Sequence, residues 1–338
     1  MHIALSEDQT LLQDSLERVL REQSTGPRIR AAEPTGFDRA LWNVLVEQGI
    51  PMLRVPEPQG SDMSLLHAVV AAECAGRYLA SAPVVESIVT NRLLARLGGA
   101  ALPLLEECLA GKTIATLALH DTGAAPVQVV PAAAVAGHVV CCDGKAVTIR
   151  SGLTVPDAPV HGSIPARTVD LSTGKALRFE GAAAVAHYAA AREEWKLLMA
   201  AQVTAAARRG VENAAEYACE RVAFGRKIGE YQGVSHVLAD VVTDLEGARI
   251  LVLRAVEKLG AKDPLSAAGA DAGATLQMAW WWAGQAARNA ALRAMRVFGG
   301  YGMTMEYDAQ LYWRRANGWT LQAGTPDLAI DAVAARLW

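Results

Sequence analysis

Apolar residues recur every three to four positions through both ends of this chain, and that spacing predicts helices there. Near the amino terminus, Leu12, Leu16 and Leu20 lie on one face of such a helix, and Ser6 stands at its start. Serine is a favoured helix N-cap because its hydroxyl accepts a hydrogen bond from a free backbone amide. Residues 1–111 are therefore expected to be helical. The same spacing returns in three further stretches of this part, at residues 37–48, 64–78 and 85–97.

The spacing changes near Lys112, where short segments rich in β-branched residues replace the helical pattern. Asp143-Gly144 is a tight-turn sequence between two of these segments. We expect residues 112–185 to form a small antiparallel β domain. The expected strands cover residues 113–119, 127–130, 138–142, 146–150, 168–171 and 177–179.

Helical spacing returns after residue 185, in longer stretches that are rich in alanine. The series Leu197–Val211 and Val234–Leu259 both place apolar residues three or four positions apart. Asp263-Pro264 has the form of an N-cap followed by a proline in the first turn, and the helix it opens runs to about Arg296. Long helices with short connections predict a four-helix bundle over residues 186–338. The expected fold is thus mainly α with a central β domain.

Composition narrows the class of protein. The chain has 338 residues, 52% of them hydrophobic, and a formal net charge of −3, which argues against disorder and against a basic surface for nucleic acid. The five cysteines show no CxxC pair and no metal-ligand spacing with histidine, so we expect reduced thiols and no metal. No signal peptide precedes the first helix, and no apolar run reaches the roughly 18 residues of a membrane span. We therefore expect a cytoplasmic protein.

Two glycine-containing segments stand out because each follows a long expected helix. In the first, Arg221 and Phe224-Gly225 form the turn, and Gln232 opens the next helix. A guanidinium binds a diphosphate through a planar fork, and glycine lets the backbone approach a ligand. The alternative is that Arg221 caps the preceding helix and Gly225 only ends it. The second segment contains Gly299, Gly300 and Gly302, and it is not a Rossmann loop because no strand precedes it.

Together these segments resemble the acyl-CoA dehydrogenase family, flavoproteins that desaturate acyl thioesters. The family's Glu-Arg-x-x-Phe-Gly segment, matched by Glu220–Gly225, holds the FAD pyrophosphate, and a family glutamine is matched by Gln232. The family's Gln-x-x-Gly-Gly segment lies against the adenylate part of FAD. It is matched by Gly299-Gly300, with Arg296 in place of the glutamine. The resemblance covers nearly the whole chain and implies that FAD contacts Arg221, Phe224, Gln232, Arg296, Gly299 and Gly300.

Other parts of the family pattern are missing. Leu119–Ala125 stands where the family's flavin-ring loop reads Thr-Glu-Pro-x-Ala-Gly-Ser-Asp, and no strand matches the tryptophan-containing one that covers the ring. The family's reaction also needs a glutamate that removes the α-proton while hydride leaves the β-carbon. Ala323 occupies one of the two places where the family carries this glutamate, and Trp195 occupies the other.

Glu194, one residue before Trp195, is the remaining candidate for the catalytic base. An offset of one residue turns a side chain by about 100° around a helix, so the alignment must shift by one for Glu194 to act. The alternative is a surface glutamate near the start of a helix, where it complements the helix dipole.

Three functions are consistent with this pattern. In the first, the chain is the catalytically incomplete partner of a second acyl-CoA dehydrogenase-like subunit and supplies the ADP-binding half of its FAD site. In the second, it is a self-sufficient FAD-dependent dehydrogenase with Glu194 as base. In the third, it is a flavin-free structural helical protein. Family sites lie across a dimer interface, and the retained residues belong to the half given in trans, which favours the first function.

The resemblance also implies partners. These are an acyl-CoA substrate, an electron-transfer flavoprotein as acceptor, and a second subunit, which is either another family member or a copy of this chain. Short family members without the base are partners of complete ones, some of them in bacterial breakdown of sterol side chains. Trp280-Trp281-Trp282 cannot all face one site on a helix, so core packing or a subunit contact explains them better than flavin stacking. We expect a tetramer, formed as a dimer of dimers.

Overall fold

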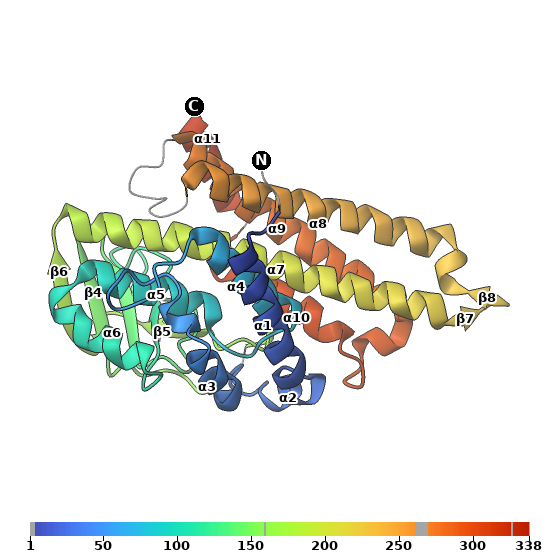
Figure 1. Ribbon diagram of the computed structural model, residues 1–338, viewed down its shortest axis with the longest axis horizontal. Helices are drawn as coiled ribbons and strands as arrows, with labels where there is room; N and C mark the ends of the chain where they lie inside the picture. Colours follow the sequence, from blue (N-terminus) through green and yellow to red (C-terminus); the bar gives the residue numbers. More distant parts are fainter. Residues whose placement is uncertain (1–3, 159, 261–269, 326, 338) are drawn as a thin grey trace.

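A computed structural model describes residues 4–158, 160–260, 270–325 and 327–337 of the chain. Helices form both ends of the sequence and strands form the middle (Figure 1). The fold class expected from the sequence is therefore confirmed. The N-cap expected at Asp263-Pro264 lies outside the described residues.

The amino-terminal helices begin at the expected N-cap. The Ser6 hydroxyl accepts from the backbone amide of Gln9 at 3.3 Å, and the Gln9 side chain accepts from the amide of Ser6 at 2.9 Å. This reciprocal pair is a capping box, and it satisfies two amides that the helix itself leaves free. The stretches expected at 37–48, 64–78 and 85–97 agree within two residues with α3, α4 and α5. The helices are α1 (Glu7–Gln23), α2 (Gly26–Ala31), α3 (Arg39–Glu47), α4 (Leu65–Arg77), α5 (Val84–Leu97) and α6 (Leu102–Leu109).

The strands of the middle region form two small sheets. One has the order β1-β3-β4-β6, and the other pairs β2 with β5. The expectation of a wholly antiparallel arrangement was wrong for one pair, because β1 and β3 run parallel. The chain leaves β1, passes through β2 in the other sheet and returns, and a crossover of that length permits parallel pairing. The strands are β1 (Ala115–Leu117), β2 (Val127–Val130), β3 (His138–Cys142), β4 (Ala146–Ser151), β5 (Arg167–Asp170) and β6 (Lys175–Glu180).

Alternation along β3 separates two cores. Val139 and Cys141 pack with residues of β2 and β5 in a small core between the sheets. Val140 and Cys142 belong to the main core, which the helices share. Successive side chains of a strand point to opposite faces, so one strand serves both cores.

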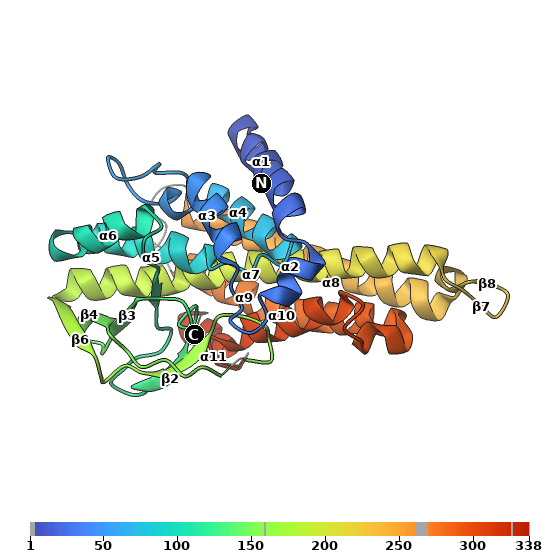
Figure 2. The same cartoon turned by 90° about the horizontal axis from the view of Figure 1, so that it is seen from below.

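The carboxy-terminal helices form a bundle around α7, which has 39 residues and is therefore about 58 Å long. Both views place the sheets near one end of α7 and the β7–β8 hairpin at the other (Figures 1 and 2). The Tyr188 hydroxyl of α7 donates to the Ala118 carbonyl oxygen at 2.6 Å and ties the helix to the sheet. The elements are α7 (Ala182–Glu220), β7 (Val222–Ala223), β8 (Arg226–Lys227), α8 (Gln232–Leu259), α9 (Ala270–Val297), α10 (Ala309–Leu321) and α11 (Asp327–Leu337).

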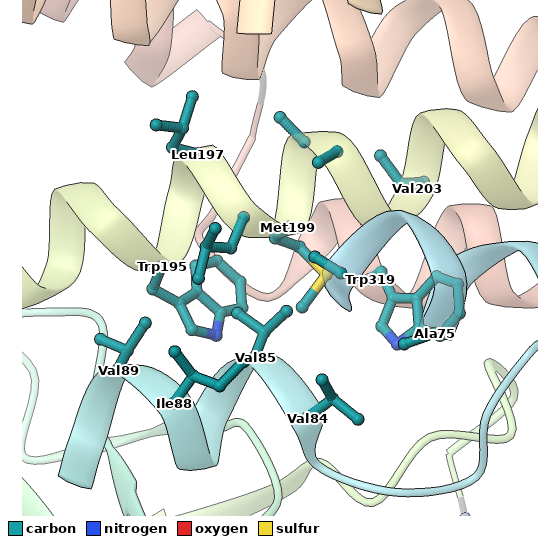
Figure 3. Packing of buried hydrophobic residues seen from close by; sticks show 14 of the residues in the cluster. Ala75, Val84, Val85, Ile88, Val89, Trp195, Leu197, Met199, Val203 and Trp319 are labelled. Atoms are coloured by element: carbon teal, nitrogen blue, oxygen red, sulfur yellow. The ribbon is translucent and has the colours of Figure 1, made fainter. Parts of the chain in front are cut away.

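The helices pack closely because small residues lie where they cross. A Cβ atom at Gly76 of α4 would collide with the backbone of Gln202 in α7, so this crossing requires glycine. The Trp195 ring extends from α7 towards Val85 and Ile88 of α5 (Figure 3). Trp280 is buried against Trp195, with the ring centroids 5.8 Å apart. The core-packing interpretation therefore holds for the first tryptophan of the triplet.

Candidate functional site

The β7–β8 hairpin at the end of α7 carries the first candidate segment. Phe224 and Gly225 form its turn with φ of +54° and +84°, a left-handed geometry that glycine adopts freely and phenylalanine seldom does. The Tyr231 hydroxyl donates to the Ala223 carbonyl oxygen at 3.1 Å and braces the turn. The Phe224 side chain is 97% exposed, and Arg221 is exposed where α7 ends. Both side chains are thus presented outward from a braced turn.

The second candidate segment begins where α9 ends. Phe298 is buried, and its ring stacks on Tyr217 of α7 with the centroids 4.7 Å apart. Gly299 follows with φ of +62°, which turns the chain away from the helix. Arg296 and Gly300 are exposed. The stacked rings hold the glycine turn against the last turns of α7, close to the hairpin.

A shallow hollow connects this segment with the start of α8. Its volume is about 190 Å³. Gln232 is the first residue of α8 and is exposed beside the hollow. The start of α8, where Gln232 lies, and the end of α9, where Arg296 lies, are therefore close together. Arg293 lies there too, and sequence reasoning missed it although it stands one helical turn before Arg296. Residues lining the hollow are Gly233, Val234, Val237, Arg293, Arg296 and Val297.

This end of the bundle has the chemistry of an anion site. Arg221 and Arg296 are exposed guanidiniums, which form paired hydrogen bonds with phosphate oxygens. Cβ atoms placed at Gly225, Gly299 and Gly300 would meet nothing within 4 Å among the described residues, so a ligand can approach the backbone there. The amino terminus of α8 adds partial positive charge. These residues fit the diphosphate and adenylate half of a dinucleotide.

Glu194 lies elsewhere, about 40 Å back along α7 from Arg221. It is 1% exposed, so the alternative of a surface glutamate was wrong. Its carboxylate accepts from Arg54 Nε at 3.0 Å and also from Arg92 Nη1. Burial alone would raise the pKa of Glu194, but the charges and hydrogen bonds of the two arginines outweigh burial and hold that pKa below its ordinary value. The carboxylate is a structural anion held in its charged form.

The other candidate base position, Ala323, lines a cavity of about 260 Å³ together with His120. His120 belongs to the segment that stands in place of the family's flavin-ring loop. Glu193, which sequence reasoning missed, supplies a carboxylate to this cavity. That carboxylate accepts from Lys196 Nζ at 3.2 Å and from the Gln277 side chain. The segments at His120 and at Ala323, which both depart from the family pattern, therefore meet at one cavity. Glu193 and cationic side chains also line this cavity.

The described residues offer two further exclusions. No group of three or more histidine, cysteine, aspartate or glutamate side chains among them has the arrangement of a metal site. Within the same part of the chain, no helix is both long and apolar enough to cross a membrane.

Comparison with known proteins identifies the family. Residues 6–102 match the acyl-CoA dehydrogenase N-terminal domain, and residues 187–338 match the acyl-CoA dehydrogenase C-terminal domain. Acyl-CoA dehydrogenase FadE27 of Mycobacterium tuberculosis is 30% identical over an alignment of 326 residues, and the match covers 83% of this chain and 83% of that protein. Acyl-CoA dehydrogenase IpdE2 of Mycolicibacterium smegmatis is 27% identical over 333 residues, or 95% of this chain and 96% of that protein. The chain belongs to the acyl-CoA dehydrogenase family.

Solved structures agree on the fold. The ChsE4-ChsE5 complex from Mycobacterium tuberculosis contains a chain that superposes with a TM-score of 0.88 at 23% identity. The superposition covers 100% of this chain and 99% of that one. The order of an α domain, a β domain and a helical bundle is therefore that of a solved member of the fold.

Proposed function

We propose that this chain is the base-lacking subunit of a heteromeric acyl-CoA dehydrogenase and that it supplies the ADP-binding half of the FAD site to a second, complete subunit. Bound FAD would accept the hydride that leaves the β-carbon of the acyl-CoA thioester. In this proposal Arg221 and Arg296 bind phosphate oxygens, while Gln232 and the Gly299-Gly300 turn hold the adenylate side.

One observation carries the proposal: neither of the positions expected for a base offers a carboxylate that is free to take a proton. Ala323 has no acidic group, and the Glu194 carboxylate is buried between two arginines that favour its charged form. A general base needs a pKa near the working pH and access to the proton that it removes. Glu194 meets neither requirement, which weighs against a self-sufficient enzyme.

The distribution of retained residues supports the same proposal. The diphosphate-binding side chains are exposed at one end of the bundle, whereas the cavity beside His120 and Ala323 is lined by arginine and lysine. A subunit that keeps the ADP-binding residues but lacks the ring-binding ones fits a flavin site that a partner subunit completes. A solved protein with the same fold is described as a complex of two chains, ChsE4 and ChsE5, and this also favours a heteromer.

The experiment compares the chain purified alone with the chain co-expressed with a complete acyl-CoA dehydrogenase-like subunit. Alone, it should show no acyl-CoA-dependent reduction of an artificial electron acceptor, since loss of a general base costs about 10²–10⁴-fold in rate. The co-purified complex should be yellow and active, with an electron-transfer flavoprotein as acceptor. Robust turnover by the isolated chain that disappears in a Glu194→Gln or Glu193→Gln variant shown to be folded would overturn the proposal. Absence of flavin from both preparations would favour the structural protein instead.

A further inference from the structure

The cavity beside Ala323 has a composition that the proposed subunit role does not explain. It lies between α7, α9, α11, the segment that follows α10 and the segment after β1, and its volume is about 260 Å³. Arg192 and Lys196 enter it from one face of α7, four residues apart, and Arg336 enters from α11. The remaining walls are formed by Leu119, His120, Glu193, Gln277, Ala323, Leu328 and Ala332.

The charges that line the cavity do not balance. The three cations face one carboxylate, Glu193, which lies 3.2 Å from Lys196 Nζ and 3.8 Å from Arg336 Nη2. Gln277 is fully buried and forms hydrogen bonds with both Lys196 and Glu193, so it holds these two side chains in place. Arg192 Nε is buried and has no hydrogen-bond partner among the described residues. Among the described residues that line it, the cavity therefore has two more cationic than anionic side chains and one donor without a partner.

The cations act on one another. Burial is the main cause that lowers the pKa of Lys196; the Glu193 charge opposes this, while Arg192 and Arg336 lower it further. Burial also lowers the pKa of His120, and Arg192 again adds to the effect, so His120 is neutral near pH 7. Like charges four residues apart on a helix are destabilising, and they are more so where water is scarce. A bound anion would offset this cost.

We propose that this cavity binds a small organic dianion, such as a short dicarboxylate or a phosphate monoester. Two negative charges would balance the excess, and arginine binds either group through paired hydrogen bonds. Leu119, Ala323, Leu328 and Ala332 form an apolar wall that suits a short carbon skeleton. The volume lies just below the roughly 300 Å³ at which pockets begin to hold drug-sized ligands, so the ligand is small. This site is separate from the exposed arginines of the hairpin, and the proposal does not depend on the heteromeric role.

Titration calorimetry on the full chain at constant ionic strength tests the site. The probes are succinate, inorganic phosphate and the neutral 1,4-butanediol. We expect at least one anion to bind and the diol not to bind. Arg336→Gln should weaken binding about tenfold or more, because it removes a charge-assisted hydrogen bond. Arg336→Lys should restore part of the affinity, since it keeps the charge.

Arg254→Gln is the matched control, because Arg254 is an exposed arginine of α8 that pairs with Glu257 outside the cavity. It should leave the dissociation constant within about twofold of the unmodified value, as expected for a distant surface charge. Lys196→Met provides a second cavity variant, and thermal unfolding checks that each variant is folded. Tighter binding of succinate assigns the dicarboxylate, and tighter binding of phosphate assigns the phosphate group. The proposal is overturned if both anions bind no better than chloride, or if Arg336→Gln and Arg254→Gln weaken binding equally.

Discussion

Glu194 and Trp195 are neighbours on α7 but have different environments. The Glu194 carboxylate joins α7 to Arg54, which precedes α4, and to Arg92 of α5. Trp195 packs on Trp280 and donates through Nε1 to the buried Glu86 carboxylate at 3.3 Å. One turn of α7 thus connects the amino-terminal helices with the bundle through buried polar groups. The two carboxylates differ in one respect: Glu194 has cationic partners that lower its pKa, whereas burial dominates at Glu86.

Glu194→Gln should destabilise the chain strongly. Removing one member of a buried ion pair leaves uncompensated charge, and such losses are about 3–5 kcal/mol. Urea unfolding near pH 7 measures the change. Glu216→Gln, on the exposed side of the same helix, should cost about 0–1 kcal/mol, because its pair with Arg209 is solvated. Equal effects of the two substitutions would show that the Glu194 carboxylate is not a buried structural anion.

The Glu194 contribution should also depend on pH. Because the folded-state pKa is lowered, the stabilisation is complete above the ordinary pKa of 4.5 and is lost as the pH falls through the folded value.

Glu86→Gln should stabilise the chain at neutral pH. Burial raises the pKa of Glu86, and hydrogen bonds from its own backbone amide and from Trp195 only partly oppose the rise. The contribution of Glu86 to wild-type stability is then greatest below the ordinary value of 4.5 and declines as the pH rises through the folded pKa. Glutamine keeps the acceptor for Trp195 and has no charge to bury. Urea midpoints between pH 5 and 8 should show an advantage that grows with pH and reaches the order of 1 kcal/mol. A constant difference across that range would contradict the assignment.

At the scale of elements, the last turns of α7 and the segment that follows α9 are held together by stacked rings, while Arg221 and Arg296 remain exposed. Tyr217 of α7 contacts the rings of Phe298 and Tyr307, and these contacts support the last turns of α7. This arrangement presents Arg221 and Arg296 from rigid elements. Preorganised donors bind an anion with less loss of conformational entropy than mobile ones.

Arg221→Ala should lower the FAD content of the assembled complex. The substitution removes a charge-assisted contact, which is typically worth about 1.5–3 kcal/mol, or roughly a tenfold to hundredfold weaker retention. Absorbance at 450 nm after gel filtration measures the content. The Arg254→Ala variant, whose charge lies on the exposed surface of α8, should keep its flavin. If the Arg221→Ala complex retains as much flavin as the unmodified one, the assignment of Arg221 is rejected.

At the scale of the whole molecule, the bundle end exposes several large apolar side chains, and exposed apolar patches mark interaction sites. These side chains are more than half exposed, and they belong to the same two segments as the arginines that we assign to FAD. Such a patch fits a subunit interface. The residues are Val222, Phe224, Tyr301, Met303 and Met305.

We therefore expect a dimer-based complex, most simply a tetramer formed as a dimer of dimers, with one flavin for every two polypeptide chains. Only the interface that includes the complete subunit's ring-binding side can hold the flavin, so half of the potential sites stay empty. Flavin absorbance measured against subunit concentration, with the mass from light scattering, gives the ratio. A measured ratio of one flavin per polypeptide chain would contradict this prediction.

Local features of the sequence determined the elements. The helical spacing, the Ser6 N-cap and the Asp143-Gly144 turn each depend on residues a few positions apart, and the structure confirms all three. The two glycine segments also fall where helices end, because glycine is needed where φ is positive. The amino acids around Arg221 and Gly299 therefore carried the family resemblance without any knowledge of the packing.

Tertiary structure alone decided the rest. Arg54 and Arg92 are 140 and 102 residues away from Glu194 in the sequence, so no local pattern indicated that its carboxylate is buried between them. The parallel pairing of β1 with β3 and the cationic cavity beside Ala323 arise in the same way. The spacing of hydrophobic residues along the sequence determines which face of an element is buried. The rotation and offset at which two elements meet depend on packing across the whole core, and those contacts determine which charges become partners.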